Sequence, residues 1–211
     1  MVKMFDRILV LAPHTDDGEM GCGGSMSKFV EEGKNVHYVA FSGAEESVPE
    51  GMPKGILRTE ALRATKELGL CQDQVTIQRF RVRYFSDSRQ EILDEMIVLK
   101  QEINPDLVFL PSSCDTHQDH IVVTQEGIRC FKQCTMLGYE LPWNNLLFQT
   151  GCFIKLYKRH LEKKINGISC YHSQKDRSYF KRTFWESLAR VRGIQIQESL
   201  AEAFEVIRWV F

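Results

Sequence analysis

The chain has 211 residues, enough for one sizeable domain, and its 43% hydrophobic and 26% charged residues are the balance of an ordinary globular protein. Its 27 lysines and arginines against 28 aspartates and glutamates give a formal net charge of −1, which disfavours a nucleic-acid binder. No apolar run is long enough to span a bilayer, and residues 1–7 lack the apolar core of a signal peptide. We therefore expect a cytoplasmic protein without a transmembrane segment.

The seven cysteines are odd in number and irregular in spacing. This distribution argues against a disulfide framework and is typical of a reducing compartment. Cys130 and Cys134 are four residues apart in a helical pattern, but no second Cys or His pair completes a metal site with them. We therefore interpret both as ordinary thiols.

Strand and helix patterns alternate along the chain, which predicts a single α/β domain over residues 1–211 with a mostly parallel sheet. The expected strands are residues 7–13, 35–42, 75–80, 107–110, 139–142 and 146–157. The expected helices are residues 20–32, 56–70, 88–103, 119–136, 158–170 and 178–192. We expect residues 194–197 to form a short extended piece and the apolar residues 201–211 to form an edge strand.

Two clusters of polar residues each follow directly after a buried strand. Their members are His14, Asp16 and Asp17 in the first cluster and His117, Asp119 and His120 in the second. In open α/β sheets, ligands bind at the edge formed by the carboxyl ends of the strands. We therefore expect the two clusters to meet at that edge.

The residue types and their spacing predict a divalent metal site that hydrolyses an amide. His14 and Asp17 are three residues apart and can converge on one ion, with His120 as the third ligand. Hydrolytic Zn²⁺ sites hold three protein ligands and leave a position for water, and another divalent transition metal suits the same ligands. Asp16 is expected to act as the general base that takes a proton from the zinc-bound water and later delivers it to the leaving amine.

His117 lies one helical turn before His120, and in its charged form it would stabilise the oxyanion of a tetrahedral intermediate. Asp119 is expected to orient a histidine. Each cluster by itself has a plainer explanation. Asp17 suits a cap of the next helix, and the second cluster suits the start of a helix. Only the two clusters together favour a catalytic site.

The segment from Pro13 to Glu19, with the glycines that follow it, and the later His117-x-Asp119-His120 resemble the PIG-L/LmbE-like de-N-acetylase family. Residues 171–174 (Tyr-His-Ser-Gln) and 201–204 (Ala-Glu-Ala-Phe) resemble further signatures of this family, so the resemblance spans almost the whole chain. It implies a Rossmann-like three-layer αβα fold with a small C-terminal extension, and the zinc-dependent removal of an acetyl group from an amino sugar such as N-acetylglucosamine. The resemblance implies His14, Asp17 and His120 as zinc ligands, Asp16 as the base and His117 as the oxyanion or acid partner.

Two residues depart from the family's usual pattern. This chain has Thr15 where the pattern has proline, and Gly18 where the pattern has glutamate. Neither position supplies a proposed ligand. Gly18 is expected to loosen the turn and to alter the wall that faces the sugar.

Four residues are candidate substrate contacts. Arg58 is the nearest candidate for the family's substrate-binding arginine, and an ordinary surface arginine is an equally good explanation. Glu45 either binds sugar hydroxyls or belongs to a solvated acidic loop. His172 is expected to line the pocket from the C-terminal part. Trp143 either stacks on a sugar ring or anchors a loop in the core.

Two other functions stay open: a zinc amidase acting on a non-sugar or thiol-conjugate amide, and a non-catalytic Rossmann-like binding protein. The glycines after the first strand have the wrong spacing for a dinucleotide fingerprint. Arg79, Arg81 and Arg83 occupy alternate positions, which we interpret as a solvated strand edge rather than a phosphate site. The expected partner is a small N-acetyl sugar or glycoconjugate. The apolar C-terminal residues also offer a surface for a homo-oligomer, although burial within one chain is the default.

Overall fold

The computed structural model describes residues 5–211, and in this range seven strands form one sheet in the order β3-β2-β1-β4-β5-β7-β6. The strands are β1 (Arg7–His14), β2 (Asn35–Ser42), β3 (Val75–Ile77), β4 (Leu107–Pro111), β5 (Thr135–Tyr139), β6 (Cys152–Lys155) and β7 (Ala201–Arg208). The helices are α1 (Asp17–Glu31), α2 (Ile56–Glu67), α3 (Arg89–Ile103), α4 (Gln118–Cys130), α5 (Lys158–Ser169) and α6 (Arg182–Ile194). Strands β1 to β5 are parallel, and β7 is antiparallel to both of its neighbours. The predicted α/β fold with a mostly parallel sheet is confirmed.

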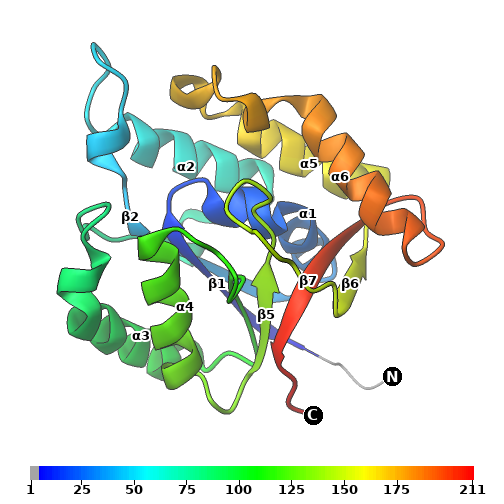
Figure 1. Cartoon of the computed structure of the whole chain (residues 1–211), viewed down its shortest axis with the longest axis horizontal. Coiled ribbons are helices and arrows are strands. Elements are labelled where there is room, and N and C mark those ends of the chain that lie inside the picture. Colours follow the sequence, from blue (N-terminus) through cyan, green and yellow to red (C-terminus); the bar gives the residue numbers. More distant parts are fainter. Residues whose placement is uncertain (1–4) are drawn as a thin grey trace.

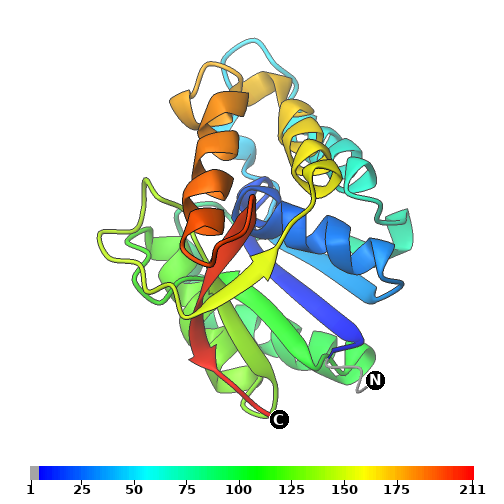
Figure 2. The ribbon, with the colours of Figure 1, turned by 90° about the vertical axis from the view of Figure 1, so that its right-hand side faces the viewer.

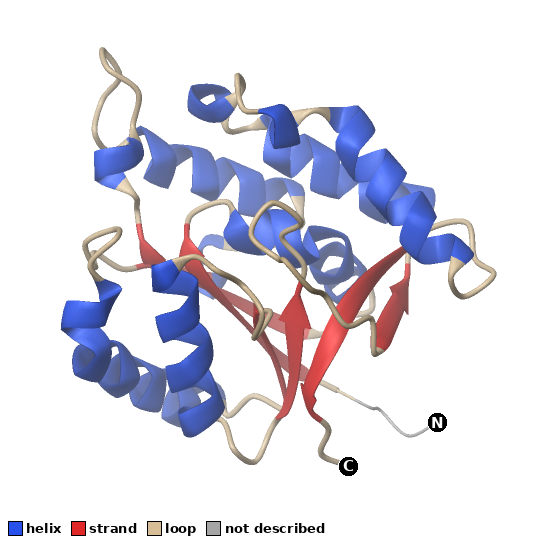
Figure 3. Ribbon diagram, viewed as in Figure 1, coloured by secondary structure: helices blue, strands red, loops and turns tan. Residues whose placement is uncertain are grey.

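Helices cover both faces of the sheet (Figure 3). Helices α1, α2, α5 and α6 lie over one face, and α3 and α4 lie over the other (Figure 1). Successive side chains of a strand point to opposite faces, so Ile8 and Val10 of β1 belong to the first core and Leu9 and Leu11 to the second. The unbroken apolar run of β1 is therefore the consequence of burial on both faces. This arrangement is the three-layer αβα architecture.

The boundary between α4 and β5 was predicted wrongly. A helix was expected through residue 136, but α4 ends at Cys130 and β5 begins at Thr135, where it pairs in parallel with β4. The turn at residues 131–134 contains neither glycine nor proline, so the local pattern gives no sign that the helix stops.

Four further expectations differ from the structure. Residues 139–142 are not a separate strand, because only Tyr139 belongs to β5 and a loop follows it. Helix α6 starts at Arg182 instead of residue 178, and residues 195–197 form a turn rather than an extended piece. Strand β3 ends at Ile77, three residues earlier than expected. These are short segments whose local patterns are overridden by tertiary contacts.

Strand β7 is not an edge strand. It lies between β5 and β6 (Figure 2), so β6 forms the edge at this end of the sheet. The expected C-terminal edge strand is therefore corrected to an interior one that pairs on both sides. Among the helices of residues 5–211, none combines the length and apolar character needed to cross a bilayer. All seven cysteines are free thiols.

Candidate active site

The two polar clusters meet at the carboxyl ends of β1 and β4. β1 ends at His14 and α1 starts at Asp17, while β4 ends at Pro111 and α4 follows His117, its N-cap residue. The two strands are parallel neighbours, so their carboxyl ends lie at the same edge of the sheet (Figure 1). Residues about a hundred positions apart in the chain thereby form one site, at the edge where ligands bind in such sheets.

Three side-chain atoms of the clusters form a compact triangle. His14 Nδ1 lies 3.1 Å from Asp17 Oδ2, His120 Nε2 lies 3.2 Å from the same oxygen, and the two nitrogens are 3.4 Å apart. With metal–ligand bonds of about 2.0–2.1 Å, ligand atoms of a tetrahedral Zn²⁺ site lie about 3.3 Å from one another. The triangle therefore has the size and the donor atoms that fit a divalent metal ion. His117 adjoins the triangle, since ligand atoms of His14, His117 and His120 all lie within 4.8 Å of one another.

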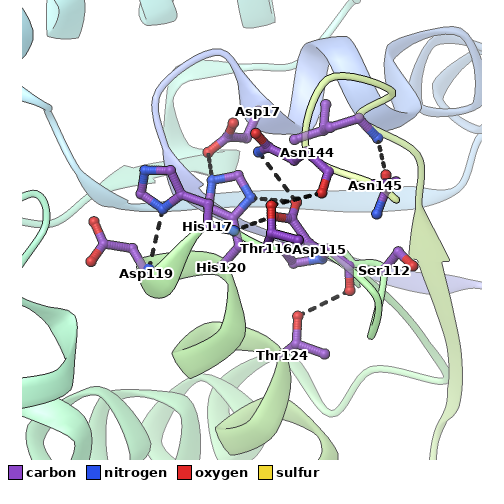
Figure 4. A network of polar contacts seen from close by, with 12 residues as sticks. Asp17, Ser112, Asp115, Thr116, His117, Asp119, His120, Thr124, Asn144 and Asn145 are labelled. Atoms are coloured by element: carbon purple, nitrogen blue, oxygen red, sulfur yellow. Dashed lines mark hydrogen bonds and ion pairs between the residues drawn. The ribbon is translucent and has the colours of Figure 1, made fainter. Parts of the chain in front are cut away.

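Two further aspartates orient the histidines of the triangle. Asp119 Oδ2 lies 2.8 Å from His14 Nε2. Asp115 Oδ2 lies 2.8 Å from His120 Nδ1 (Figure 4). In each ring the carboxylate engages the nitrogen outside the triangle, which leaves the other nitrogen free to bind an ion. Asp119 is fully buried and is not among the pocket residues, so its contacts are those of a positioning residue.

Asp115 was missed by the sequence reasoning. Besides His120, it accepts the backbone N–H of His117 on Oδ1 at 2.8 Å. The signal in the sequence is weak, because an aspartate two residues before the N-cap of a helix is also a common turn residue. Its role depends on the position of His120, five residues further on.

The charges of the triangle support one another. Burial opposes the ionised form of Asp17, but His120 and His14 hold the pKa of its carboxyl well below the ordinary range. Burial likewise opposes the charged form of His120, but the charge of Asp17 and the contact with Asp115 raise its pKa to about 10. The carboxyl of Asp17 is therefore ionised, which is the form that binds a metal ion.

Asp16 adjoins the triangle and has an unusual backbone. Its φ of 87° and ψ of −31° lie on the left-handed side, which residues other than glycine rarely occupy. The side chain lines the pocket described below. Burial raises the pKa of Asp16 well above its ordinary value, and the charges of Asp17 and Glu19 add to this effect. A strained backbone and a raised pKa at a pocket are typical of a functional carboxyl group.

His117 presents one ring nitrogen to α4 and keeps the other available. Its Nδ1 accepts the backbone N–H of Asp119 at 3.2 Å (Figure 4), so the ring proton is on Nε2. Burial and the nearby His120 and His14 lower the pKa of His117 to about 4. This pKa gives a neutral ring near pH 7, with the Nε2–H as its remaining donor, and the role of His117 in catalysis stays a prediction.

A pocket of about 230 Å³ opens beside the triangle. It contains His14, Asp16, Asp17, His117 and His120. The remaining polar and aromatic lining consists of Thr15, Ser47, Arg83, Trp143, Asn144, Gln174, Arg177 and Tyr179. Most of these lie on loops, whose roles are hard to assign from a single sequence.

Of the four predicted substrate contacts, Trp143 lies in the pocket lining and three do not. The Trp143 ring stacks on that of Tyr179, with centroids 4.0 Å apart and 11° between the planes. The Arg58 guanidinium donates to two backbone carbonyls at the end of β3, at 2.6 and 2.9 Å. His172 is exposed and Glu45 half-buried, and both lie outside the lining. The prediction for these three residues therefore gains no support from their positions.

The two C-terminal signatures attach distant elements to α1 and α2. Tyr171 donates its hydroxyl to Glu19 of α1 at 2.7 Å, and the Ser173 backbone donates to Glu60 of α2 at 3.0 Å. Glu202 of β7 accepts from the buried Lys164 of α5 at 2.6 Å and from two backbone N–H groups of α1. Tyr171, Ser173 and Glu202 hold the frame around the site and lie outside the pocket, whereas Gln174 of the first signature lines it.

The two departures from the family pattern are buried. A Cβ on Gly18 would lie 2.5 Å from the ring of Tyr38, so glycine is needed for close packing. Gly18 lies in the first turn of α1 and outside the pocket, and the expectation that it loosens the turn is wrong. Thr15 does line the pocket, and its buried hydroxyl has no hydrogen-bond partner within residues 5–211.

The fold and the site define a class: three-layer α/β proteins with a His-Asp-His cluster suited to a divalent metal at the carboxyl edge of the sheet. The chain belongs to the PIG-L family, described as GlcNAc-PI de-N-acetylase, and the family match covers residues 9–131. This range contains both clusters.

One protein and two solved structures illustrate what the chain is similar to. The chain is 27% identical over 179 residues to the uncharacterized deacetylase YaiS of Escherichia coli (strain K12), which covers 79% of this chain and 90% of the relative. It superposes with a TM-score of 0.82 on the conserved protein TT1542 from Thermus thermophilus, at 23% identity, covering 99% of this chain and 97% of the other. The N,N'-diacetylchitobiose deacetylase from Pyrococcus horikoshii gives a TM-score of 0.81 at 21% identity, covering 97% and 85%. At these identities the two structural matches establish the fold.

Proposed function

We propose that the protein is a zinc-dependent hydrolase that removes the acetyl group from an N-acetylated amino sugar or sugar conjugate. The observation that carries the proposal is the triangle of His14, Asp17 and His120 beside the unusual carboxyl of Asp16. Membership of the PIG-L family supports a deacetylase, and the name of the Pyrococcus relative supports a sugar substrate.

The triangle would hold the ion, and zinc is proposed because two imidazoles and one carboxylate are a ligand set that zinc uses in hydrolytic sites. A Zn²⁺ ion held there would polarise the acetyl oxygen and lower the pKa of a water molecule. Asp119 and Asp115 keep His14 and His120 in the orientation that this binding needs.

Asp16 is proposed as the general base and then the general acid. It accepts a proton from the attacking water and gives it to the amine nitrogen when the carbon–nitrogen bond breaks, so that acetate and a free amino sugar are released. Its raised pKa suits both steps, because a group that titrates nearer to neutrality exchanges protons more readily in either direction.

His117 is proposed to stabilise the tetrahedral intermediate. Its Nδ1 is occupied by the Asp119 backbone, so the Nε2–H is the donor left for the developing oxyanion. The stacked rings of Trp143 and Tyr179 line the same pocket and are proposed to offer an apolar face to a sugar ring.

Metal analysis and acetate release test the proposal together. Purified protein should contain about one zinc per chain and should release acetate from at least one member of a panel of N-acetyl sugars, sugar nucleotides and glycolipid headgroups. Zinc binding with turnover of only non-sugar or thiol-conjugate amides would favour the amidase alternative. Protein that binds no zinc after reconstitution and hydrolyses nothing would favour the non-catalytic alternative.

A cytoplasmic location is part of the proposal and is supported by the seven free thiols. A single domain over residues 1–211 and a homo-oligomer stay predictions. Size-exclusion chromatography with light scattering measures the oligomeric state directly.

A further inference from the structure

One glutamate of β7 reaches the loop that carries part of the candidate site. The carboxylate of Glu205 accepts three hydrogen bonds from two serines that follow β4. Its Oε2 accepts the Ser112 hydroxyl at 2.8 Å and the Ser113 backbone N–H at 2.7 Å, and its Oε1 accepts the Ser113 hydroxyl. Hydrogen bonds to a carboxylate are stronger than those between neutral groups. Glu205 does not line the pocket, so its contacts are those of a residue that acts through the loop.

The side chain of Glu205 passes over β5 to reach these serines. In the sheet β5 lies between β4 and β7, and Gly138 of β5 is the register partner of Glu205. A Cβ on Gly138 would lie 3.0 Å from Glu205 Oε2 and 3.0 Å from the Ser112 Cα. Ordinary contacts between carbon atoms are about 3.5–4.0 Å, so a larger residue at this position would displace the carboxylate or the loop. The glycine therefore leaves the space that the contact between β7 and the loop requires.

The anchored serines lead directly to Asp115. The Asp115 backbone N–H donates to the Ser112 carbonyl at 3.0 Å, which closes a turn over residues 112–115. The carboxylate of Asp115 contacts His120 Nδ1 at 2.8 Å (Figure 4) and accepts the His117 backbone N–H at 2.8 Å. Glu205 is thus connected to a proposed metal ligand through one turn and one side chain.

The loop has no regular structure that would fix this turn by itself. Residues 112–117 belong to neither a helix nor a strand of the sheet, so their position depends on individual polar contacts. At one end the Ser112 N–H donates to the Tyr139 carbonyl at 3.1 Å. At the other end the Thr116 N–H and hydroxyl donate to the Asn144 carbonyl, which itself lies on a loop, at 3.2 and 2.9 Å. Glu205 adds three bonds from an interior strand, which tie the loop to the sheet.

We propose that Glu205 is a positioning residue of the candidate metal site. It holds the turn of residues 112–115 so that Asp115 keeps the His120 ring oriented with Nε2 in the triangle. The inference rests on the proposed function for the use of this geometry, the binding of zinc. Its geometric part concerns the protein alone and is measured without metal and without turnover.

Two substitutions separate the reach of Glu205 from its charge. Glu205→Asp keeps the charge but is shorter by one methylene, so its carboxylate cannot hold both serines at the present distances. Glu205→Gln loses the charge and keeps the reach. Its amide oxygen accepts the Ser113 N–H, and its NH₂ donates to the Ser113 hydroxyl, which is able to act as the acceptor. A positioning role predicts damage in Glu205→Asp and rescue in Glu205→Gln, and a purely electrostatic role predicts the opposite.

Two readouts follow the position of His120. In the metal-free protein, NMR of the histidine rings detects the Nδ1–H of His120 while it is bonded to Asp115, and this resonance is assigned by its absence in His120→Ala. Glu205→Asp should shift or lose it. In competition with a chromophoric chelator, Glu205→Asp should weaken Zn²⁺ binding by about tenfold, the lower end of the effect of groups that orient metal ligands. Glu205→Gln should stay within about twofold of the wild type.

Glu198→Asp is the matched control. Glu198 is an exposed glutamate paired with Lys155, and shortening it should change neither readout. Thermal unfolding checks that every variant is folded. The plainer explanation, that Glu205 only stabilises a surface loop, predicts a lower melting temperature without any change at His120 or in zinc affinity.

The outcomes distinguish this inference from the proposed function. It is overturned if Glu205→Gln weakens zinc binding as much as Glu205→Asp, or if neither variant changes the two readouts, and acetate release by the wild type would still support the deacetylase. If Glu205→Asp moves the His120 resonance and Glu205→Gln does not, the positioning role stands. It stands in that case even when the wild type releases acetate from no N-acetyl compound, a result that would refute the deacetylase.

Discussion

Glu202 and Lys164 form a buried ion pair whose loss should strongly destabilise the protein. The ammonium of Lys164 lies 2.6 Å from Glu202 Oε1, and the two side chains are only 4% and 7% exposed. The second carboxylate oxygen accepts the backbone N–H and the hydroxyl of Ser25 at 2.7 and 2.6 Å. The pair therefore joins β7, α5 and α1 in a region that water hardly reaches.

Glu202→Gln removes the negative charge and keeps the shape. If the amide oxygen stays on Ser25, the amide NH₂ faces the Lys164 ammonium and the N–H of Gly24, so three donors meet without an acceptor. Removing one partner of a buried pair typically costs about 3–5 kcal/mol, because the other charge stays buried and uncompensated. We expect a loss of this size in the free energy of unfolding from urea titrations monitored by circular dichroism.

Two comparisons make the experiment decisive. Glu198→Gln breaks the pair of Glu198 with Lys155, whose side chains are 39% and 64% exposed, and should cost less than about 1 kcal/mol. Adding Lys164→Met to Glu202→Gln removes the orphaned charge and should restore at least about 1 kcal/mol. The reasoning is refuted if Glu202→Gln costs no more than Glu198→Gln, or if Lys164→Met makes the double variant less stable still.

Three further predictions concern the site. Asp16→Asn should lower kcat by about a hundredfold or more, the usual contribution of a general base, while zinc content stays at the wild-type value; an active variant would contradict the assigned role. Zn²⁺ at about a hundred times its Kd should stabilise the wild type by about 2.7 kcal/mol in thermal unfolding, and His14→Ala should abolish the shift. Asp115→Asn should weaken Zn²⁺ binding about tenfold or more in competition with a chromophoric chelator, whereas the exposed Asp87→Asn should not change it.

The first cluster could be predicted from the sequence because its members are close together in the chain. The apolar residues 8–13 and the following His14, Asp16 and Asp17 are visible in a short window, and the two proposed ligands are three positions apart. Placing His120 in the same site needed one more rule, namely that ligands of a parallel sheet bind at the carboxyl ends of its strands. The structure brings His120 to the expected place because β4 is the direct neighbour of β1.

Arg83 shows why other parts of the site were not predictable. Its alternation with Arg79 and Arg81 indicated a strand edge, but β3 ends at Ile77 and the arginines lie on a loop. What directs this loop to the pocket is Asp119, a residue 36 positions away that also contacts His14 of the triangle. A contact of this kind leaves no periodic signal in either segment.

The glycines after the first cluster have a structural explanation that also concerns the C-terminal strand. They lie inside α1 rather than in a separate turn. A Cβ on Gly24 would lie 2.6 Å from Leu156 and 3.1 Å from Glu202 Oε1, the oxygen that accepts the Gly24 N–H. Glycine thus lets α1 approach β7 closely enough for this bond to form. Because Asp17 is the first residue of the same helix, the position of this proposed metal ligand depends on packing against a strand nearly two hundred residues later in the chain. The local motif supplies the donor atoms, and the distant strand fixes the helix that carries one of them.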